Sequence, residues 1–193
     1  PGDFSSASIL MALAAVNKSK ITVTNLNINS IQGDIKILDI LREMGAKISI
    51  NENEITVSSD GLSGNNFNLN DTPDLLPVVA VMALSAEGET IISGVEHARF
   101  KESDRIKILY NELSKLGVKI IEKKDGLKII GTKKLQGNEL NCYGDHRLFM
   151  VLCIASTICD KPCIINGAES IDVSYPLFLR DIKQLGVEVI YND

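Results

Sequence analysis

The chain has 193 residues, 45% of them hydrophobic and 23% charged, a composition typical of a globular protein and unlike that of a disordered one. Its longest apolar run is well below the roughly 18 residues that a membrane span needs, so we expect no membrane partner. The net charge of −5 provides no general attraction to nucleic acid or to an anionic membrane surface. Nucleic-acid binding is therefore not expected either.

Four cysteines fall in the last third of the chain: Cys142, Cys153, Cys159 and Cys163. They lack the close C-x-x-C pairing of a zinc site, so no metal is expected. Cys153 and Cys159 lie in an apolar run that predicts a helix, which favours buried free thiols. Free thiols are typical of a reducing cytoplasm, and the amino end shows no secretory pattern. We therefore predict a cytoplasmic protein.

Three aspartates mark an internal repeat, because Asp3, Asp74 and Asp145 recur at a constant interval (145 − 74 = 74 − 3 = 71). Each is followed by an apolar run that predicts a helix, at 5–16, 75–86 and 148–158. After a short polar break, a β-branched segment predicts a strand, at 21–24, 90–92 and 163–165.

The second part of each unit repeats as well. Helices are predicted from Gly33, Asp104 and Pro176, and each ends in a hydrophobic residue followed by glycine. Alternating strands are predicted next, at 46–50, 118–121 and 187–190. The first two return through polar turns into strands at 55–57 and 127–130, which predicts two hairpins.

We therefore predict one α/β domain over residues 1–193, with pseudo-threefold symmetry and repeats at about 1–71, 72–142 and 143–193. The third repeat lacks its return strand. We expect another segment of a longer polypeptide to complete that sheet; a natural edge strand is the alternative.

Two charged clusters lie where helices are predicted to begin. The first runs from His97 to Arg105, and the second is Gly144-Asp145-His146-Arg147. Acidic residues at such positions often cap helices, which is our interpretation of Asp3. For Asp74 and Asp145 a functional role stays open, because helix N-termini that converge around a threefold axis would suit an anion.

Several strings in these regions resemble one known family. They are Gly2-Asp3-Phe4-Ser5-Ser6-Ala7, Pro73-Asp74, Lys101-Glu102-Ser103-Asp104-Arg105, Asp125-Gly126-Leu127, Gly144-Asp145-His146-Arg147 and Ser174-Tyr175-Pro176. In this order they resemble the carboxyl-terminal half of the EPSP synthases, or 3-phosphoshikimate 1-carboxyvinyltransferases. The resemblance implies an inside-out α/β barrel of three βαβαββ units. It also implies an active site in the cleft against a second such domain, and pairing of the family's N-terminal segment with this domain.

The resemblance implies transfer of the enolpyruvyl group of phosphoenolpyruvate to the 5-hydroxyl of shikimate 3-phosphate, in the shikimate pathway, with no metal or organic cofactor. Asp74 would be the proton acceptor and Glu102 the second catalytic carboxylate. Shikimate 3-phosphate would meet Asp74, Lys101 and His97. Phosphoenolpyruvate would be held by Arg105, Arg147 and His146.

The chain departs from the family pattern at Val173, where many members have a lysine that contacts phosphoenolpyruvate. The other domain's residues are absent, so we expect this chain to carry half an active site and to be inactive alone; the full-length enzyme is expected to be a monomer. Three alternatives remain: a UDP-N-acetylglucosamine enolpyruvyl transferase, a fold relative that cyclises RNA ends, and a non-catalytic binding module. The Lys-Glu-Ser-Asp-Arg string argues against the first two.

Overall fold

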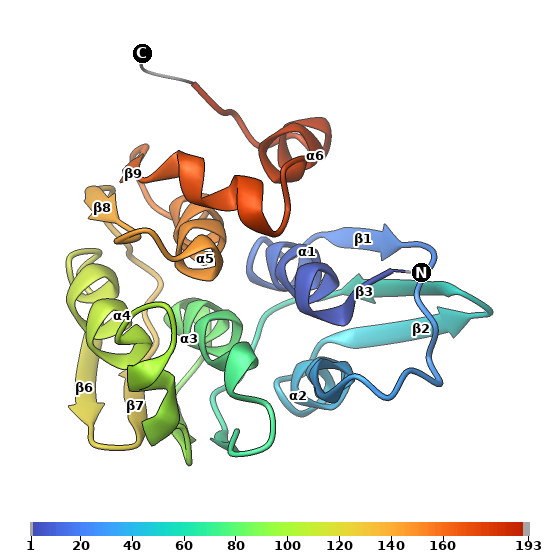
Figure 1. The fold of residues 1–193 in the computed structure, drawn as a ribbon, viewed down its shortest axis with the longest axis horizontal. Coiled ribbons are helices and arrows are strands. Elements are labelled where there is room, and N and C mark those ends of the chain that lie inside the picture. Colours follow the sequence, from blue (N-terminus) through green and yellow to red (C-terminus); the bar gives the residue numbers. More distant parts are fainter. Residues whose placement is uncertain (1, 191–193) are drawn as a thin grey trace.

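Three helices form the centre of the protein. The structure, a computed structural model, describes residues 2–190. α1 (Phe4–Val16), α3 (Leu76–Ser85) and α5 (His146–Ser156) lie side by side and pack against one another (Figure 1). In α3 every residue from Leu76 to Leu84 is buried, as expected for a helix that is apolar on all sides. These three helices are the ones predicted after the repeating aspartates.

A second set of helices lies outside this centre, and two of them pack against strands. It comprises α2 (Ile37–Glu43), α4 (Arg105–Ser114) and α6 (Phe178–Gln184). Gly45, Gly117 and Gly186, which follow their carboxyl ends, have φ angles of 97°, 85° and 96°. Glycine adopts this left-handed conformation without steric cost, so the predicted helix endings are confirmed.

Within the part of the chain that the structure describes, the strands form three separate sheets. The first has the order β1 (Lys20–Val23), β3 (Glu54–Ser58), β2 (Lys47–Asn51) and is antiparallel throughout. The second has the order β4 (Asn66–Asn68), β5 (Glu89–Ser93), β7 (Gly126–Ile130), β6 (Lys119–Lys123), with β4 parallel to β5. The third pairs β8 (Glu139–Asn141) with β9 (Ile164–Asn166) in parallel. Both predicted hairpins, β2–β3 and β6–β7, are confirmed.

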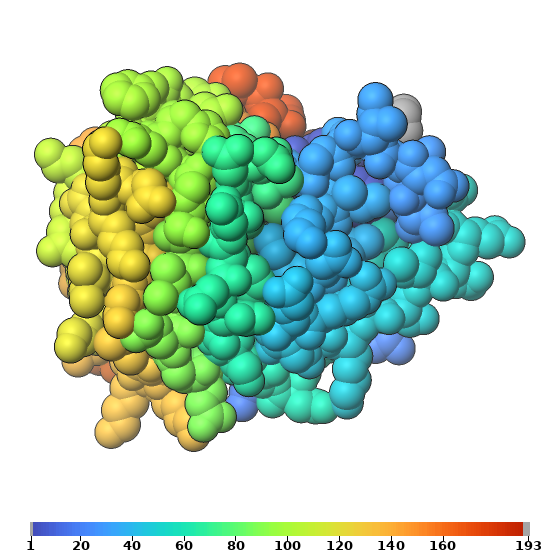
Figure 2. All heavy atoms as spheres, turned by 90° about the horizontal axis from the view of Figure 1, so that it is seen from below, coloured from blue at the N-terminus to red at the C-terminus, as the bar shows by residue number. Residues whose placement is uncertain are grey.

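The middle unit has the complete βαβαββ order, from β4 through α3, β5 and α4 to β6 and β7. Its opening strand β4, and the equivalent β8, were not predicted. Each precedes its repeating aspartate and pairs with the strand that follows the central helix. The fold is thus α/β as expected. Figure 2 shows the first unit (blue to cyan) and the second (green to yellow) side by side on one face.

The strand predicted at 187–190 is wrong, because these residues form no strand in the structure. The Val187 N–H at the start of the segment donates to the Ile182 carbonyl and not to a strand. A strand needs a neighbour, and within residues 2–190 β9 pairs with β8 alone. A segment that completes this sheet stays a prediction.

The cysteines also differ from the prediction. All four are free, and Cys142 and Cys153 are buried as expected. However, α5 ends at Ser156, so Cys159 lies beyond the helix and is half-buried, like Cys163.

Across the described residues, none of the helices has the length and apolar character that crossing a bilayer demands.

Candidate active site

Arg105 is the centre of a cluster of charged side chains. It is the first residue of α4 and is completely buried, which is rare for arginine unless it is paired. Its Nε donates to Asp145 Oδ2 at 2.8 Å, its Nη1 to Asp74 Oδ1 at 2.9 Å and its Nη2 to Glu102 Oε2 at 2.6 Å. A further contact joins Nη2 to Asp145 Oδ1 at 3.4 Å. Three carboxylates from separate segments thus meet one guanidinium group.

Asp145 has two roles in this cluster. It is the N-cap of α5 and accepts the backbone N–H groups of Arg147 and Leu148. Its Oδ2 also accepts the Ser103 hydroxyl at 2.9 Å, besides Arg105. Burial alone would raise the pKa of Asp145, but the hydrogen bond and charge of Arg105 hold that pKa below its usual value. Asp145 is therefore both a helix cap and a buried counterion.

Asp74 makes no capping hydrogen bond, so the cap interpretation is wrong for this residue. It lies in a short 3-10 turn (Pro73–Leu75) before α3 begins, which turns its carboxylate away from the helix N–H groups. That carboxylate instead faces Arg105 Nη1 at 2.9 Å, Arg147 Nη2 at 3.5 Å and Lys101 Nζ at 3.6 Å. Burial would raise the pKa of Asp74, but the three cations outweigh burial and hold that pKa below its usual value.

Asp3, the third repeating aspartate, is an ordinary cap. It accepts the backbone N–H groups of Ser5 and Ser6 at the start of α1, together with the Gln32 side-chain amide. The cap prediction is confirmed here, and no ion pair of Asp3 is found among the described residues. The equivalent helix starts have thus diverged into one cap, one cap with a counterion, and one carboxylate among cations.

The structure brings five of the seven proposed site residues into direct contact: Asp74, Lys101, Glu102, Arg105 and Arg147. His146 precedes Arg147 in the first turn of α5 and is half-buried. Burial lowers the pKa of His146; the charges of Arg147 and Arg105 add to this, and those of Asp145 and Glu102 oppose it. We therefore expect a neutral imidazole beside the cluster.

His97 is not joined to the others. It lies exposed in a 3-10 turn (Glu96–Phe100), and its side chain makes no hydrogen bond or ion pair with any residue that the structure describes. Val173, at the end of another such turn (Ala168–Val173), is 81% exposed and supplies no charge in place of the family's lysine.

Arg99 supports the loop that carries Lys101 and Glu102, and the sequence analysis missed it. Its guanidinium pairs with Asp104, the N-cap of α4, at 3.0 Å and with Glu122 of β6 at 2.8 Å. It also donates to two backbone carbonyls of the β6–β7 hairpin. The loop is therefore anchored on the Arg99 side as well as by Arg105.

Asp34 is a second missed residue near the cluster. It is 9% exposed and accepts the Ser5 hydroxyl. Burial raises the pKa of Asp34; Ser5 and Arg147 oppose this, while the charges of Asp74 and Asp3 add to it. The repeat could have revealed it, since Asp34 is one interval before Arg105 (105 − 34 = 71).

The cluster can bind anions and transfer protons. Lys101, Arg105 and Arg147 balance the charges of Asp74, Glu102 and Asp145. Glu102 is the most exposed of the carboxylates, with 51% of its side chain accessible.

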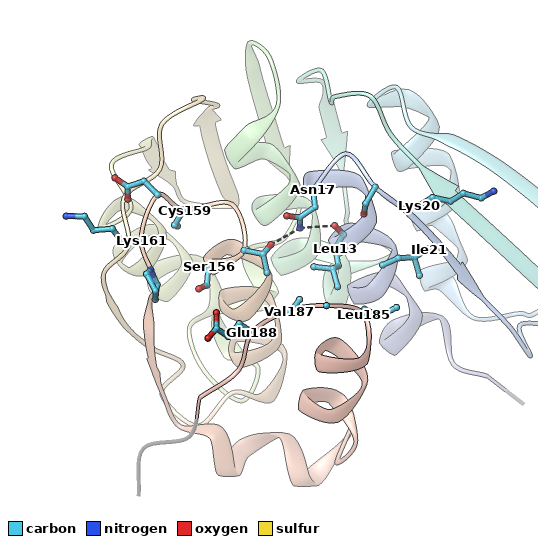
Figure 3. A pocket seen from close by; sticks show the side chains of 15 residues that line it. Leu13, Asn17, Lys20, Ile21, Ser156, Cys159, Lys161, Leu185, Val187 and Glu188 are labelled. Carbon is cyan, nitrogen blue, oxygen red and sulfur yellow. Dashed lines mark hydrogen bonds between the residues drawn. The ribbon is translucent and has the colours of Figure 1, made fainter.

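A cavity of about 550 Å³ lies elsewhere, at the carboxyl ends of α1 and α5, where Asn17, Cys159 and Val187 line it (Figure 3). This cavity is therefore separate from the candidate site, whose charged residues do not line it.

Several known proteins are similar to this chain along nearly its whole length. Residues 1–182 match the family model described as EPSP synthase (3-phosphoshikimate 1-carboxyvinyltransferase). The proteins named 3-phosphoshikimate 1-carboxyvinyltransferase from Methanococcus maripaludis (strain C6) and Methanocella arvoryzae are 43% and 46% identical to this chain over 98% of its length. The chain covers 45% of each, so it spans about half the length of these curated relatives.

Solved structures show the same relationship. An EPSP synthase from Acinetobacter baumannii superposes with a TM-score of 0.84 at 27% identity, over 95% of this chain and 46% of that one. The enolpyruvyl transferase NikO from Streptomyces tendae has a TM-score of 0.80 at 18% identity, over 98% of this chain and 44% of that one, which shows a shared fold. Because the family model covers nearly the whole chain and the relatives exceed 40% identity, the chain belongs to the EPSP synthase family.

Proposed function

We propose that the protein containing this chain transfers the enolpyruvyl group of phosphoenolpyruvate to the 5-hydroxyl of shikimate 3-phosphate, and that the chain is its carboxyl-terminal domain. The observation that carries the proposal is the contact of Asp74 and Glu102 with one buried arginine, beside two partly exposed cations. Family membership supports the choice of reaction.

The two carboxylates have different surroundings, as a two-step proton transfer requires. Asp74 is kept ionised by its cations, so it can accept the proton of the attacking hydroxyl. Among the described residues, Glu102 forms an ion pair with Arg105 alone, and it is half-exposed, so its side chain can turn toward a substrate. We assign to Glu102 the delivery and recovery of the methyl proton.

The cations have distinct roles. Arg147 retains most of its N–H groups, and a planar guanidinium can hold a carboxylate or phosphate through two hydrogen bonds. Lys101 reaches toward shikimate 3-phosphate. Arg105 is buried and already uses four of its five N–H bonds, so it can take phosphoenolpyruvate when the half-exposed Glu102 turns away. His146 lies beside this position, whereas His97 must move to contact a substrate.

A second domain is part of the proposal, because the cluster is electrically balanced. Both substrates are anions, and three cations against three carboxylates leave no excess charge to attract them. The missing domain would supply further cations and close over the substrates. A monomeric, cytoplasmic enzyme stays our prediction.

The test uses the full-length polypeptide with shikimate 3-phosphate and phosphoenolpyruvate, and follows phosphate release together with the mass of the organic product. Turnover should require shikimate 3-phosphate, and UDP-N-acetylglucosamine should not replace it. Glu102→Gln should reduce turnover by about 10²–10⁴-fold while calorimetry still detects shikimate 3-phosphate binding. Turnover with the UDP-sugar alone would indicate the sister transferase, and binding without any turnover would indicate a non-catalytic module.

A further inference from the structure

Two half-buried thiols lie in contact near the carboxyl end of α5, whose amino end belongs to the charged cluster. The sulfur atoms of Cys159 and Cys163 are 3.9 Å apart and share a hydrogen bond. Cys159 follows the carboxyl end of α5, and Cys163 precedes β9. The three residues between them, 160–162, form an exposed turn. Neither thiol is used by the proposed transferase reaction.

The other two cysteines provide an internal comparison. Cys142 is completely buried, and its Sγ contacts the Gly167 carbonyl at 3.4 Å. Cys153 is 8% exposed within α5, and burial raises the pKa of its thiol strongly. A buried thiol in apolar surroundings is inert. The contacting pair is therefore set apart by exposure as well as by geometry.

The local environment makes the pair unequal. The hydrogen bond between the two thiols lowers the pKa of Cys163; burial opposes this, and contacts with Asn138 and Ser156 assist it. The same hydrogen bond raises the pKa of Cys159. Cys163 is thus the member of the pair that ionises more readily, and the thiolate is the reactive form of cysteine.

The two sulfur atoms are close enough to form a disulfide after a small movement. A disulfide has an S–S distance of about 2.05 Å, so the sulfurs must approach by somewhat less than about 2 Å. The exposed turn between the two residues allows side-chain rotation without disturbing the core. Cys159 also lines the cavity at the ends of α1 and α5, which a small oxidant can enter (Figure 3).

We propose that Cys159 and Cys163 are a redox modification site, at which a peroxide oxidises the pair to a reversible intramolecular disulfide. The Cys163 thiolate attacks one peroxide oxygen; an S–O bond forms, the O–O bond breaks, and the departing hydroxide takes a proton to become water. The Cys159 sulfur then attacks Cys163; the S–S bond forms, the S–O bond breaks, and a second water leaves with the Cys159 proton. The two thiols lose two electrons, and one hydrogen peroxide gains them.

The disulfide would lie far from the candidate active site. α5 has 11 residues, so about 16 Å of helix separates its carboxyl end from His146 and Arg147 at its amino end. Oxidation should therefore leave the charged cluster intact. The proposal does not depend on the transferase activity, and its outcome can be judged separately.

The experiment treats the reduced full-length polypeptide with one equivalent of hydrogen peroxide, alkylates the remaining thiols and analyses the peptides by mass spectrometry. The peptide with Cys159 and Cys163 should lose about 2 Da and carry no alkyl group, and a dithiol reductant should reverse this. The peptides with Cys142 and Cys153 should remain fully alkylated.

Single variants test the order of the steps. In Cys159→Ser, Cys163 has no resolving partner, so a sulfenic acid that dimedone captures should accumulate. In Cys163→Ser, Cys159 should stay reduced. Cys153→Ala is the matched control and should form the disulfide like the parent. Oxidation spread equally over all four cysteines, or sulfinic acid at Cys163 without any S–S bond in the parent protein, would overturn the proposal.

Discussion

Arg105 and Asp145 form an ion pair from which solvent is excluded on both sides. The Nε–Oδ2 distance is 2.8 Å, and the two side chains are 1% and 0% exposed. The pair joins the first residue of α4, in the second unit, to the N-cap of α5, in the third. In the first unit Asp3 caps its helix in the same way but forms no ion pair with an arginine of residues 2–190. A comparison of these two aspartates separates capping from charge pairing.

Asp145→Asn should therefore be more damaging than Asp3→Asn. Asparagine caps a helix about as well as aspartate, so both variants keep their caps. Loss of a buried counterion costs about 3 kcal/mol in the free energy of unfolding, whereas Asp3→Asn should cost less than about 1 kcal/mol. Chemical denaturation of both variants checks this, and kcat/KM for phosphoenolpyruvate should fall in Asp145→Asn alone. Equal losses would mean that Asp145 is a cap and nothing more.

The two arginines of the cluster should also respond differently. Arg105→Ala leaves three carboxylates around an empty site, so it should lower the free energy of unfolding by about 3–5 kcal/mol. Arg147 is 18% exposed and has one long ion pair, so Arg147→Ala should leave the melting temperature nearly unchanged. Titration with phosphoenolpyruvate should show weaker binding in Arg147→Ala. Normal affinity there would remove Arg147 from the substrate site.

Asp74→Asn should separate turnover from stability. The asparagine oxygen can still accept the Arg105 hydrogen bond, so the free energy of unfolding should change by less than about 1 kcal/mol. An amide cannot accept the substrate proton, so kcat should fall by about 10²–10⁴-fold. Steady-state kinetics and thermal melts on the same preparation decide the matter. A loss of activity in proportion to a lower melting temperature would make the effect structural.

Asp34 should show the opposite dependence on pH from its acidic neighbours. Burial raises its folded-state pKa above the unfolded value of about 3.9, so its favourable contribution is complete below about pH 4 and is lost as the pH rises through the folded pKa. Asp34→Asn, which keeps an acceptor for Ser5, should therefore be as stable as the parent or more stable at pH 7, and should lose that advantage near pH 4. Urea denaturation at pH 7 and pH 4 measures the difference in the free energy of unfolding between the variant and the parent. The same difference at both pH values would contradict the prediction.

The periodic features of the fold could be predicted from the sequence. The interval between Asp3, Asp74 and Asp145 located all three central helices, and the glycines after α2, α4 and α6 marked their ends. β4 and β8 could not be predicted because each has three residues, with a single buried apolar side chain between polar ones. That sequence pattern does not differ from the pattern of a loop. The segment 187–190 alternates like a strand, but strand formation depends on a partner that the local pattern does not contain.

The candidate site was only partly predictable for a similar reason. Its residue types could be identified by resemblance, but their contacts join units that lie far apart in sequence. Asp74 follows a proline in a 3-10 turn, and that local geometry decides that it faces Arg105 rather than the α3 amides. The support of the loop by Arg99 depends on a hairpin more than twenty residues away.

The four hydrogen bonds of Arg105 also bear on how the molecule opens. One side chain connects the turn before α3, the start of α4 and the cap of α5. If one of these helix ends frays, a buried charge in the others loses its partner. The first turns of α3, α4 and α5 should therefore open together, as one cooperative unit in hydrogen exchange. The start of α1, which Asp3 and Gln32 hold without an arginine, is free to open on its own.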